Sequence, residues 1–211
     1  MRVVGGSVRG FRLETVPGEG TRPIQDRVKT ALFDILRPWI IDRTVLDLFA
    51  GSGSVGIEAL SQGAARCVFN DAGMRAVATI RKNLAATGFT GRAEVRHGDA
   101  FGYLRRTPES FDLIYVAPPQ YKNLWIEALM ILDERPQLLR APDDVDADDE
   151  PALAVAQIDP REYQPLDLQR LRETRQKRYG NTLLVFYERS EIGAIDTKSD
   201  KTAQNNANGF A

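Results

Sequence analysis

The feature that most constrains this chain is the alternation, from Thr44 onward, of short apolar runs with longer amphipathic segments. This alternation is typical of βαβ units around a parallel sheet, because two parallel strands need a crossover between them. It predicts strands at 44–49, 66–70, 92–96, 112–116, 152–158 and 181–188, and helices at about 54–62, 72–86, 100–107 and 122–133. Right-handed crossovers bring the carboxyl ends of parallel strands to one edge of the sheet. We expect ligands to bind at that edge.

The N-terminal segment has a different pattern. Residues 1–16 alternate apolar and polar side chains around three glycines, which predicts a short β-hairpin. Residues 24–39 predict an amphipathic helix, with apolar side chains on one stripe at Val28, Leu32, Ile35 and Leu36. We therefore expect an extension over 1–43, an α/β domain over 44–190 and a disordered tail over 191–211.

Charge and composition limit the classes of function. The formal net charge is -1, so nucleic acid would have to bind local basic patches. One basic patch is 170–178, with five bases and one acid, and the bases of the first thirty residues form another. Residues 141–151 form an acidic loop. One cysteine and one histidine leave no cluster of metal-ligand spacing, so we expect no metal. No apolar run approaches the roughly 20 residues of a membrane helix, which favours a cytoplasmic protein without a membrane partner.

A glycine-rich turn joins the first predicted strand to a helix. In VLDLFAGSGSVGIEAL, Gly51, Gly53 and Gly56 fit the spacing G-x-G-x-x-G, which lets the backbone approach a nucleotide. Asp71, at the end of the second strand, is placed to accept two ribose hydroxyls. NAD enzymes and S-adenosylmethionine (SAM) enzymes share these features, so the turn leaves both open.

Two further acids bear on the choice of nucleotide. Asp47 lies inside the first strand, where a buried carboxylate needs a partner such as the cationic amine of SAM, although a structural cap or salt bridge is the alternative. Asp99 is placed to accept the exocyclic amine of an adenine, or to cap the helix that follows it. Asp47 favours SAM over NAD.

Four segments together resemble a known family. DLFAGSGSVGIEALSQGA resembles the first motif of SAM-dependent methyltransferases, and APP after the fourth strand resembles the (N/D)PP(Y/F) motif of enzymes that methylate exocyclic amines. MRVVGGSVRGF, TRPIQDRVKTALFDIL and RYGNTLLVFYER resemble segments of the bacterial RsmD-like 16S rRNA guanine-N2 methyltransferases. The resemblance extends from Met1 to about Arg189.

The resemblance implies a Rossmann-like, seven-stranded class I methyltransferase sheet, with a sixth strand within 171–180 paired antiparallel to the seventh. It implies methyl transfer from SAM to the N2 amine of a guanine in 16S rRNA or the small ribosomal subunit, by a monomer. The implied cofactor-binding residues are Arg22, Asp47, Phe49, Ala50, Gly51, Ser52, Gly53, Asp71, Asp99 and Ala100. The implied catalytic segment is Ala117, Pro118, Pro119, Gln120 and Tyr121, in which the first proline carbonyl accepts the amine and the aromatic ring stacks on the base.

The sequence departs from the family motif at one position. Ala117 stands where the motif has Asp or Asn, so the side-chain acceptor of the amine is missing. Gln120, inserted before Tyr121, is the nearest replacement along the chain. The alternatives are a slower or altered enzyme, a catalytically weakened SAM- or RNA-binding relative and, with least support, an NAD(P)-dependent oxidoreductase.

Overall fold

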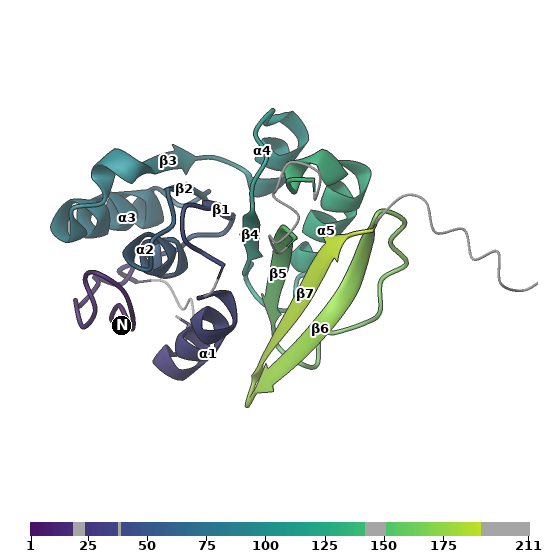
Figure 1. Ribbon diagram of the computed structural model, residues 1–211, viewed down its shortest axis with the longest axis horizontal. Coiled ribbons are helices and arrows are strands. Elements are labelled where there is room, and N and C mark those ends of the chain that lie inside the picture. The colour runs from purple at the N-terminus through teal and green to yellow at the C-terminus, as the bar shows by residue number, and fades with distance from the viewer. Residues whose placement is uncertain (19–23, 38, 142–150, 191–211) are drawn as a thin grey trace, which may run out of the picture.

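The computed structural model describes residues 1–18, 24–37, 39–141 and 151–190. Its seven strands form one sheet in the order β3-β2-β1-β4-β5-β7-β6 (Figure 1). Strands β1 to β5 are parallel, and β7 runs antiparallel to both of its neighbours. The strands are β1 (Thr44–Asp47), β2 (Arg66–Asp71), β3 (Ala93–His97), β4 (Leu113–Val116), β5 (Leu153–Ile158), β6 (Leu171–Tyr179) and β7 (Thr182–Arg189).

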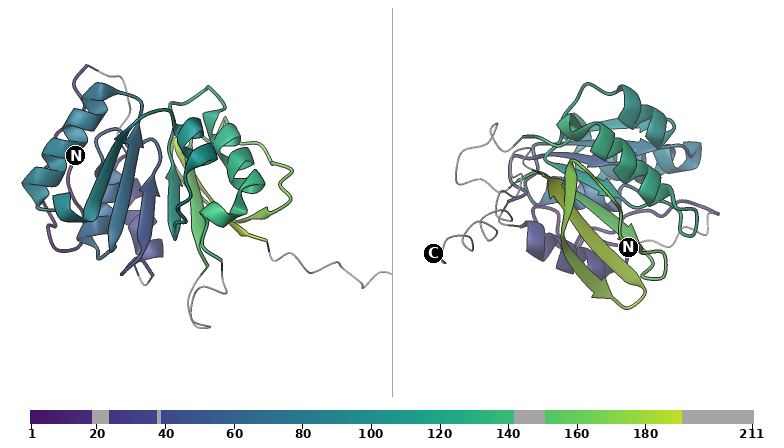
Figure 2. Two further views of the ribbon diagram at one scale, coloured as in Figure 1. Left: turned by 90° about the horizontal axis from the view of Figure 1, so that it is seen from above. Right: turned by 90° about the vertical axis from the view of Figure 1, so that its right-hand side faces the viewer.

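Helices cover both faces of the sheet (Figure 2). The helices on one face are α1 (Asp26–Leu36), α2 (Ser54–Ser61) and α3 (Met74–Thr87), and those on the other are α4 (Ala100–Arg106) and α5 (Leu124–Glu134). Short 3₁₀ turns lie at Thr90–Arg92 and Pro136–Leu138. The predicted fold class is confirmed, and the predicted strands and helices of 44–190 are present with ends shifted by at most two residues.

The central strands β1, β4 and β5 are mostly apolar and buried because helices cover both faces of this part of the sheet. In β4, Leu113 and Tyr115 pack into the layer beneath α1, α2 and α3, whereas Ile114 and Val116 pack into the layer beneath α4 and α5. All four side chains are buried. This alternation determines which side chains emerge together past the ends of the strands.

The predicted N-terminal hairpin is present but short: the N–H of Val3 donates to the carbonyl of Phe11, and the N–H of Leu13 donates to the carbonyl of Met1. Residues 1–13 fold back on themselves, but in this segment the structure has a single antiparallel bridge, between Arg2 and Arg12, and no regular strand. The reason is competition for backbone groups. The N–H groups of Val4 and Gly5 donate to the carboxylate of Glu58 on α2, at 2.8 and 2.7 Å, rather than to an opposite strand.

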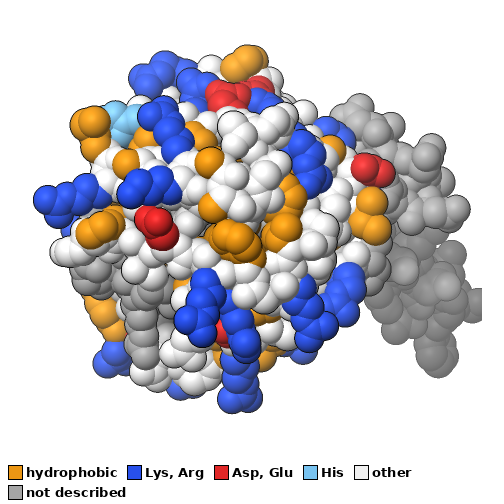
Figure 3. All heavy atoms as spheres, turned by 90° about the vertical axis from the view of Figure 1, so that its left-hand side faces the viewer, with side chains coloured by type: hydrophobic (Ala, Val, Ile, Leu, Met, Phe, Trp, Pro, Cys, Tyr) orange, Lys and Arg blue, Asp and Glu red, His pale blue; other side chains and the backbone are white. Residues whose placement is uncertain are grey.

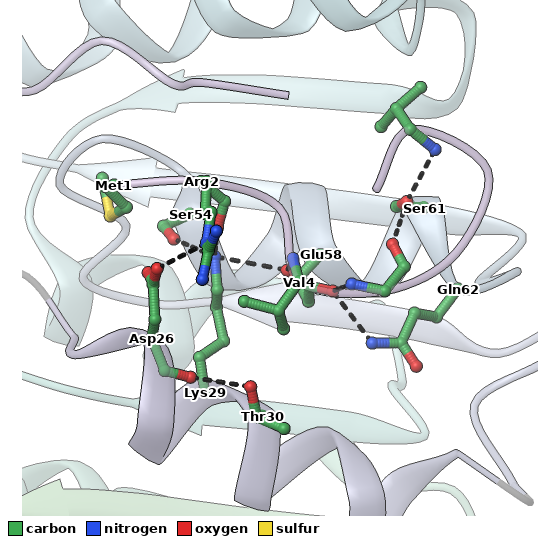
Figure 4. A network of polar contacts seen from close by, with 12 residues as sticks. Met1, Arg2, Val4, Asp26, Lys29, Thr30, Ser54, Glu58, Ser61 and Gln62 are labelled. Carbon is green, nitrogen blue, oxygen red and sulfur yellow. Dashed lines mark hydrogen bonds and ion pairs between the residues drawn. The ribbon is translucent and has the colours of Figure 1, made fainter. Parts of the chain in front are cut away.

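A buried ion pair anchors this segment (Figure 4). Lys29 on α1 lies 3.2 Å from a carboxylate oxygen of Glu58, and both side chains are fully buried. The Lys29 ammonium also donates to the carbonyl of Arg2 and to Oγ of Ser54, and burial lowers its pKa. The expectation that all bases of the first thirty residues form a surface patch is therefore wrong for Lys29.

Several predictions fall on residues outside the described ranges. They are Arg22, most of the acidic loop 141–151 and the tail 191–211. The division at residues 43 and 190 stays a prediction, although α1 packs into the same apolar layer as α2 and α3. Within the described ranges, no helix combines the length and apolar character needed to span a bilayer.

Candidate functional site

The glycine turn between β1 and α2 has the backbone that its sequence predicts. Gly51 and Gly53 have φ values of +55° and +77°, a region that side chains disfavour. A Cβ built on Gly51 would meet no atom within 4 Å, so the backbone there is open to a ligand. A Cβ on Gly56 would lie 2.3 Å from the ring of Phe69, so glycine at this position allows α2 to pack closely on β2.

Asp71 holds the glycine turn in place. It ends β2, and its Oδ2 accepts the N–H of Gly51 at 2.8 Å while its Oδ1 accepts the N–H of Gly73 at 2.8 Å. A carboxylate offers about four acceptor positions, so both oxygens can still accept a further donor. The geometry fits a carboxylate that receives ribose hydroxyls beside the turn.

Asp47 is a buried carboxylate next to the same turn. It is 2% exposed, and its Oδ2 accepts the N–H of Gly56 at 3.0 Å. Burial raises the pKa of Asp47 to about 7; the Gly56 hydrogen bond opposes this shift and the charge of Asp71 adds to it. A cationic ligand group nearby would favour the charged form. The predicted structural cap is therefore present, and the predicted contact with the SAM amine stays a proposal.

The adenine end of the expected site lies after β3. Asp99 caps α4, with its Oδ2 accepting the N–H of Gly102 at 2.6 Å, as one of its two predicted roles requires. Its exposed carboxylate borders a cavity of about 240 Å³ that Asn70 and Tyr103 also line. Ala100 is buried. The rings of Phe49 and Phe101 meet edge to face with centroids 6.1 Å apart, which gives this end an apolar contact.

Asn83 on α3 is a site residue that sequence reasoning missed. It is 1% exposed, and its Nδ2 donates to the carbonyl of Ser52 at 2.9 Å and to the carbonyl of Glu14 at 3.1 Å. It therefore ties the glycine turn to the N-terminal segment. The available signal was a polar residue on the buried stripe of an amphipathic helix.

The catalytic segment continues from the end of β4. Pro118 is buried and Pro119 is exposed, while Gln120 is partly buried in the turn that follows. Tyr121 has a φ of +61° and is 59% exposed, which leaves much of its ring open to a stacking base. A non-glycine residue at positive φ carries strain that its surroundings must compensate.

The compensating contacts come from the segment after β5. The Tyr121 hydroxyl donates to Oδ2 of Asp159 at 2.7 Å, and the Tyr121 N–H donates to the carboxylate of Glu162. The Arg161 guanidinium lies 5.5 Å from the centre of the Tyr121 ring and donates to both oxygens of Asp159 at 3.1 Å. This ion pair lowers the pKa of Asp159.

Sequence reasoning also missed Asp159, Arg161 and Glu162. Asp159 follows the last residue of β5, and β5 pairs with β4, so the carboxyl ends of the two strands lie side by side. The signal was present in IDPRE directly after a predicted strand. It could not be used without knowing that β5 is the neighbour of β4.

The structure thus gathers the described site residues at one edge. Phe49 to Gly53 follow β1, Asp71 ends β2, Asp99 with Ala100 follows β3, and the segment from Ala117 to Tyr121 follows β4. Ala117 contributes only a methyl group there. Over the described ranges, no three or more Cys, His, Asp or Glu side chains gather as metal ligands would.

Comparison with known proteins agrees with this geometry. A family model described as "Conserved hypothetical protein 95" matches residues 1–188. YlbH of Bacillus subtilis is 35% identical over 192 residues, which cover 90% of this chain and 99% of YlbH. Ribosomal RNA small subunit methyltransferase D of Escherichia coli is 36% identical over 134 residues, which cover 64% of this chain and 67% of that enzyme.

A solved structure shows the same architecture. The Escherichia coli protein yhhF superposes with a TM-score of 0.71 at 30% identity, covering 90% of this chain and 98% of yhhF. The resemblance to RsmD-like methyltransferases that the motifs indicate is therefore confirmed over nearly the whole length of the described fold. The chain belongs to the family described as Conserved hypothetical protein 95, which includes these RsmD-like methyltransferases.

Proposed function

We propose that this protein transfers the methyl group of SAM to the exocyclic N2 amine of a guanine in 16S rRNA. Methyl transfer from SAM to small-subunit rRNA follows from its family. The choice of an exocyclic amine depends on one observation. A rigid proline pair ends β4 at the cofactor edge and is followed by an exposed aromatic ring, that of Tyr121.

The residues around the glycine turn would hold the cofactor. SAM supplies a methyl group activated by its sulfonium. Gly51 would present open backbone to it and Gly53 would complete the turn, while Asp71 would accept the ribose hydroxyls and Asp47 would bind the methionine amine. Asp99 with Ala100 would border the adenine. Arg22 is proposed to border the methionine end and lies outside the described residues.

The catalytic segment would hold the target amine. The N2 lone pair of guanine is delocalised into the ring, so the site must orient its N–H bonds toward acceptors and stabilise developing positive charge. The carbonyl of Pro118 is one such acceptor, and proline fixes its direction. The ring of Tyr121 would stack on the extruded base. Orientation of this kind can contribute about 7–11 kcal/mol of the barrier.

The face of β6 would contact the RNA backbone. Along β6, every residue from Arg172 to Arg178 is exposed. Lys177 pairs with Leu184, and Leu184 pairs with Gln157, which is level with Ala117 in the strand register. With strands roughly 4.8 Å apart, Lys177 lies about 14 Å from Ala117 across the sheet. That separation suits a phosphate near the target nucleotide.

A second face also offers bases to a large substrate. Figure 3 shows the side of the molecule that carries α3 and the N-terminal segment, where Lys and Arg side chains are spread over the surface with few acids. Such patches compensate for the slightly negative net charge. We propose that a cytoplasmic monomer binds 16S rRNA or the small ribosomal subunit through one or both faces.

The absence of an acceptor side chain at Ala117 supports one other candidate function. A protein that binds SAM and RNA but transfers methyl groups slowly would keep the glycine turn and the basic surfaces. Its segment after β4 would lack an effective acceptor for the amine. Loss of one preorganised hydrogen bond costs about 10²–10³ in rate in other enzymes.

One experiment separates these functions. Small ribosomal subunits from cells lacking the protein would be incubated with tritiated SAM and the purified chain, and the labelled rRNA mapped by mass spectrometry. We expect label in one N2-methylguanine. Label on another atom would contradict the proposed site of transfer, whereas calorimetric binding of SAM without transfer would support the weakened relative.

A further inference from the structure

Ala117 leaves the target amine without a side-chain acceptor from its own strand. Ala117 follows Tyr115 by two residues along β4 and the extended backbone after it, so the two side chains emerge on one face. Both pack into the apolar layer that also contains Val155 of β5. A replacement acceptor must therefore come from this face of the sheet, near the carboxyl end of a neighbouring strand.

Gln157 occupies that position. The last paired residues of β4 and β5 are Val116 and Ala156, so the next residues, Ala117 and Gln157, are level on strands about 4.8 Å apart. The hydroxyl of Tyr115 donates to Oε1 of Gln157, which places the Gln157 side chain on the same face as Tyr115 and Ala117. Gln157 is only partly buried, unlike the residues before it in β5.

Tyr115 also determines which end of the Gln157 carboxamide is fixed. Its side chain is 2% exposed, and burial, with a further contribution from the charge of Asp47, raises the pKa of the Tyr115 hydroxyl well above its ordinary value. The hydroxyl therefore stays protonated and remains a donor. A donor on Oε1 orients this oxygen and leaves it a second acceptor position.

We propose that Gln157 is a catalytic residue whose Oε1 accepts an N–H of the target amine, opposite the carbonyl of Pro118. This inference rests on the proposed transfer to an exocyclic amine. It assigns to β5 the function that the family motif gives to the residue at position 117. The methyl side chain of Ala117 leaves room for the amine to reach across to Gln157.

The chemical step is a direct displacement. The nitrogen lone pair forms the new N–C bond while the C–S bond of SAM breaks. The electron pair of the C–S bond stays on sulfur, which gives S-adenosylhomocysteine. The methylated amine then loses a proton to water. Gln157 and Pro118 hold the two N–H bonds so that the lone pair points at the methyl carbon, and neither residue needs to take the proton.

The test is single-turnover methyl transfer to small-subunit rRNA by Gln157→Ala. We expect the rate to fall about 10²–10³-fold, as for the loss of one preorganised hydrogen bond, with SAM affinity near wild type and a somewhat lower melting temperature, because the buried hydroxyl of Tyr115 loses its acceptor. Gln137→Ala, at an exposed glutamine of the turn after α5, is the matched control and should keep the wild-type rate. Tyr115→Phe should give a smaller loss, because it removes only the donor that orients Oε1.

A rescue variant separates a catalytic from a structural role. If Gln157 replaces the missing motif acid, Ala117→Asp should restore transfer in the Gln157→Ala background to at least the wild-type rate. An unchanged rate in Gln157→Ala, or a large loss of rate in Gln120→Ala instead, would overturn the assignment of the acceptor to Gln157. Neither outcome would overturn the proposed function. No transfer by the wild-type chain would overturn the proposed function together with this assignment.

Discussion

The hydroxyl of Tyr121 donates a 2.7 Å hydrogen bond to Oδ2 of Asp159, which joins the segment after β4 to the segment after β5. Asp159 is in turn fixed by Arg161, whose N–H and Nε both donate to Oδ1. Because these contacts hold Tyr121 at a positive φ with its ring largely exposed, the ring is positioned before any substrate arrives. Preorganisation of this kind reduces the entropy lost on binding.

Replacing the ring of Tyr121 should weaken recognition of the target base. Stacking of a base on an aromatic side chain contributes about 1–3 kcal/mol, so Tyr121→Ala should lower kcat/KM for rRNA by roughly 5- to 150-fold. Tyr121→Phe keeps the ring and loses only the hydroxyl, with its bonds to Asp159 and Arg161, so kcat/KM should fall much less. SAM affinity, measured by calorimetry, should not change in either variant. Equal losses in both would show that the hydroxyl, and not the ring, carries the effect.

The sequence predicts most of the fold because the signals for β1 to β5 and their helices are local. Apolar runs of strand length, separated by amphipathic segments, are sufficient to place them. The N-terminal hairpin is shorter than predicted because the groups that bind Val4 and Gly5 belong to Glu58, more than fifty residues later in the chain. The sequence alone contains no local signal for that competition.

The site was predicted in part for the same reason. The glycine turn, Asp71 and the proline pair are each recognised from residues close together in the chain. Gln157 and Asp159 enter the site only because β5 is the neighbour of β4, with Val116 level with Ala156. Strand order depends on how the whole sheet packs, so no window of sequence around β5 indicates it.

The buried carboxylate of Asp47 should make stability depend on pH. Its pKa is raised from about 3.9 in the unfolded chain to about 7 in the folded protein, so between these values the folded state binds more protons. The contribution of Asp47 to the free energy of unfolding therefore falls as pH rises from about 4 to 7. Asp47→Asn should remove the effect, so the melting temperature of wild type minus that of Asp47→Asn should decrease as pH rises from about 4 to 7. Parallel curves for the two proteins would contradict the shift.

The buried pair of Lys29 and Glu58 should be needed to anchor the N-terminal segment. Lys29→Met leaves the Glu58 carboxylate buried without its cation, and removing one partner of such a pair costs about 3–5 kcal/mol. Urea unfolding would measure the loss of unfolding free energy, provided that the dependence of this free energy on urea concentration is the same in the variant and in wild type. The double variant Lys29→Met with Glu58→Gln removes both charges and should be less destabilised than Lys29→Met alone. A double variant that is worse would show that the hydrogen bonds of Glu58 matter more than the charge pairing.

Ala117→Asp should raise the rate of methyl transfer. A carboxylate beside the carbonyl of Pro118 would add a charged acceptor, and such hydrogen bonds are stronger than neutral ones. Because Gln157 would already supply one acceptor, we expect the rate to rise about tenfold. This is less than the roughly 10²–10³-fold change in rate that one preorganised hydrogen bond gives in other enzymes. Ala117→Leu, similar in size and without an acceptor, is the control and should lower the rate. Tritiated SAM and small-subunit rRNA would measure all three proteins, and a slower Asp variant would contradict this account of the acceptor.

The exposed bases of β6 should account for part of the salt dependence of RNA binding. Lys177 and Arg175 pair with Leu184 and Phe186 of the neighbouring strand β7. Their side chains therefore lie on the same face of the sheet as that of Ala117. If Lys177 contacts a phosphate, Lys177→Gln should weaken binding to all rRNA sequences alike and reduce the slope of log K against log salt by about 1. Arg105→Gln on α4, beneath the opposite face and paired with Glu127, should leave the slope unchanged. An unchanged slope in Lys177→Gln would instead place the phosphate contacts on the face that carries α3, because that face offers the other broad spread of bases (Figure 3).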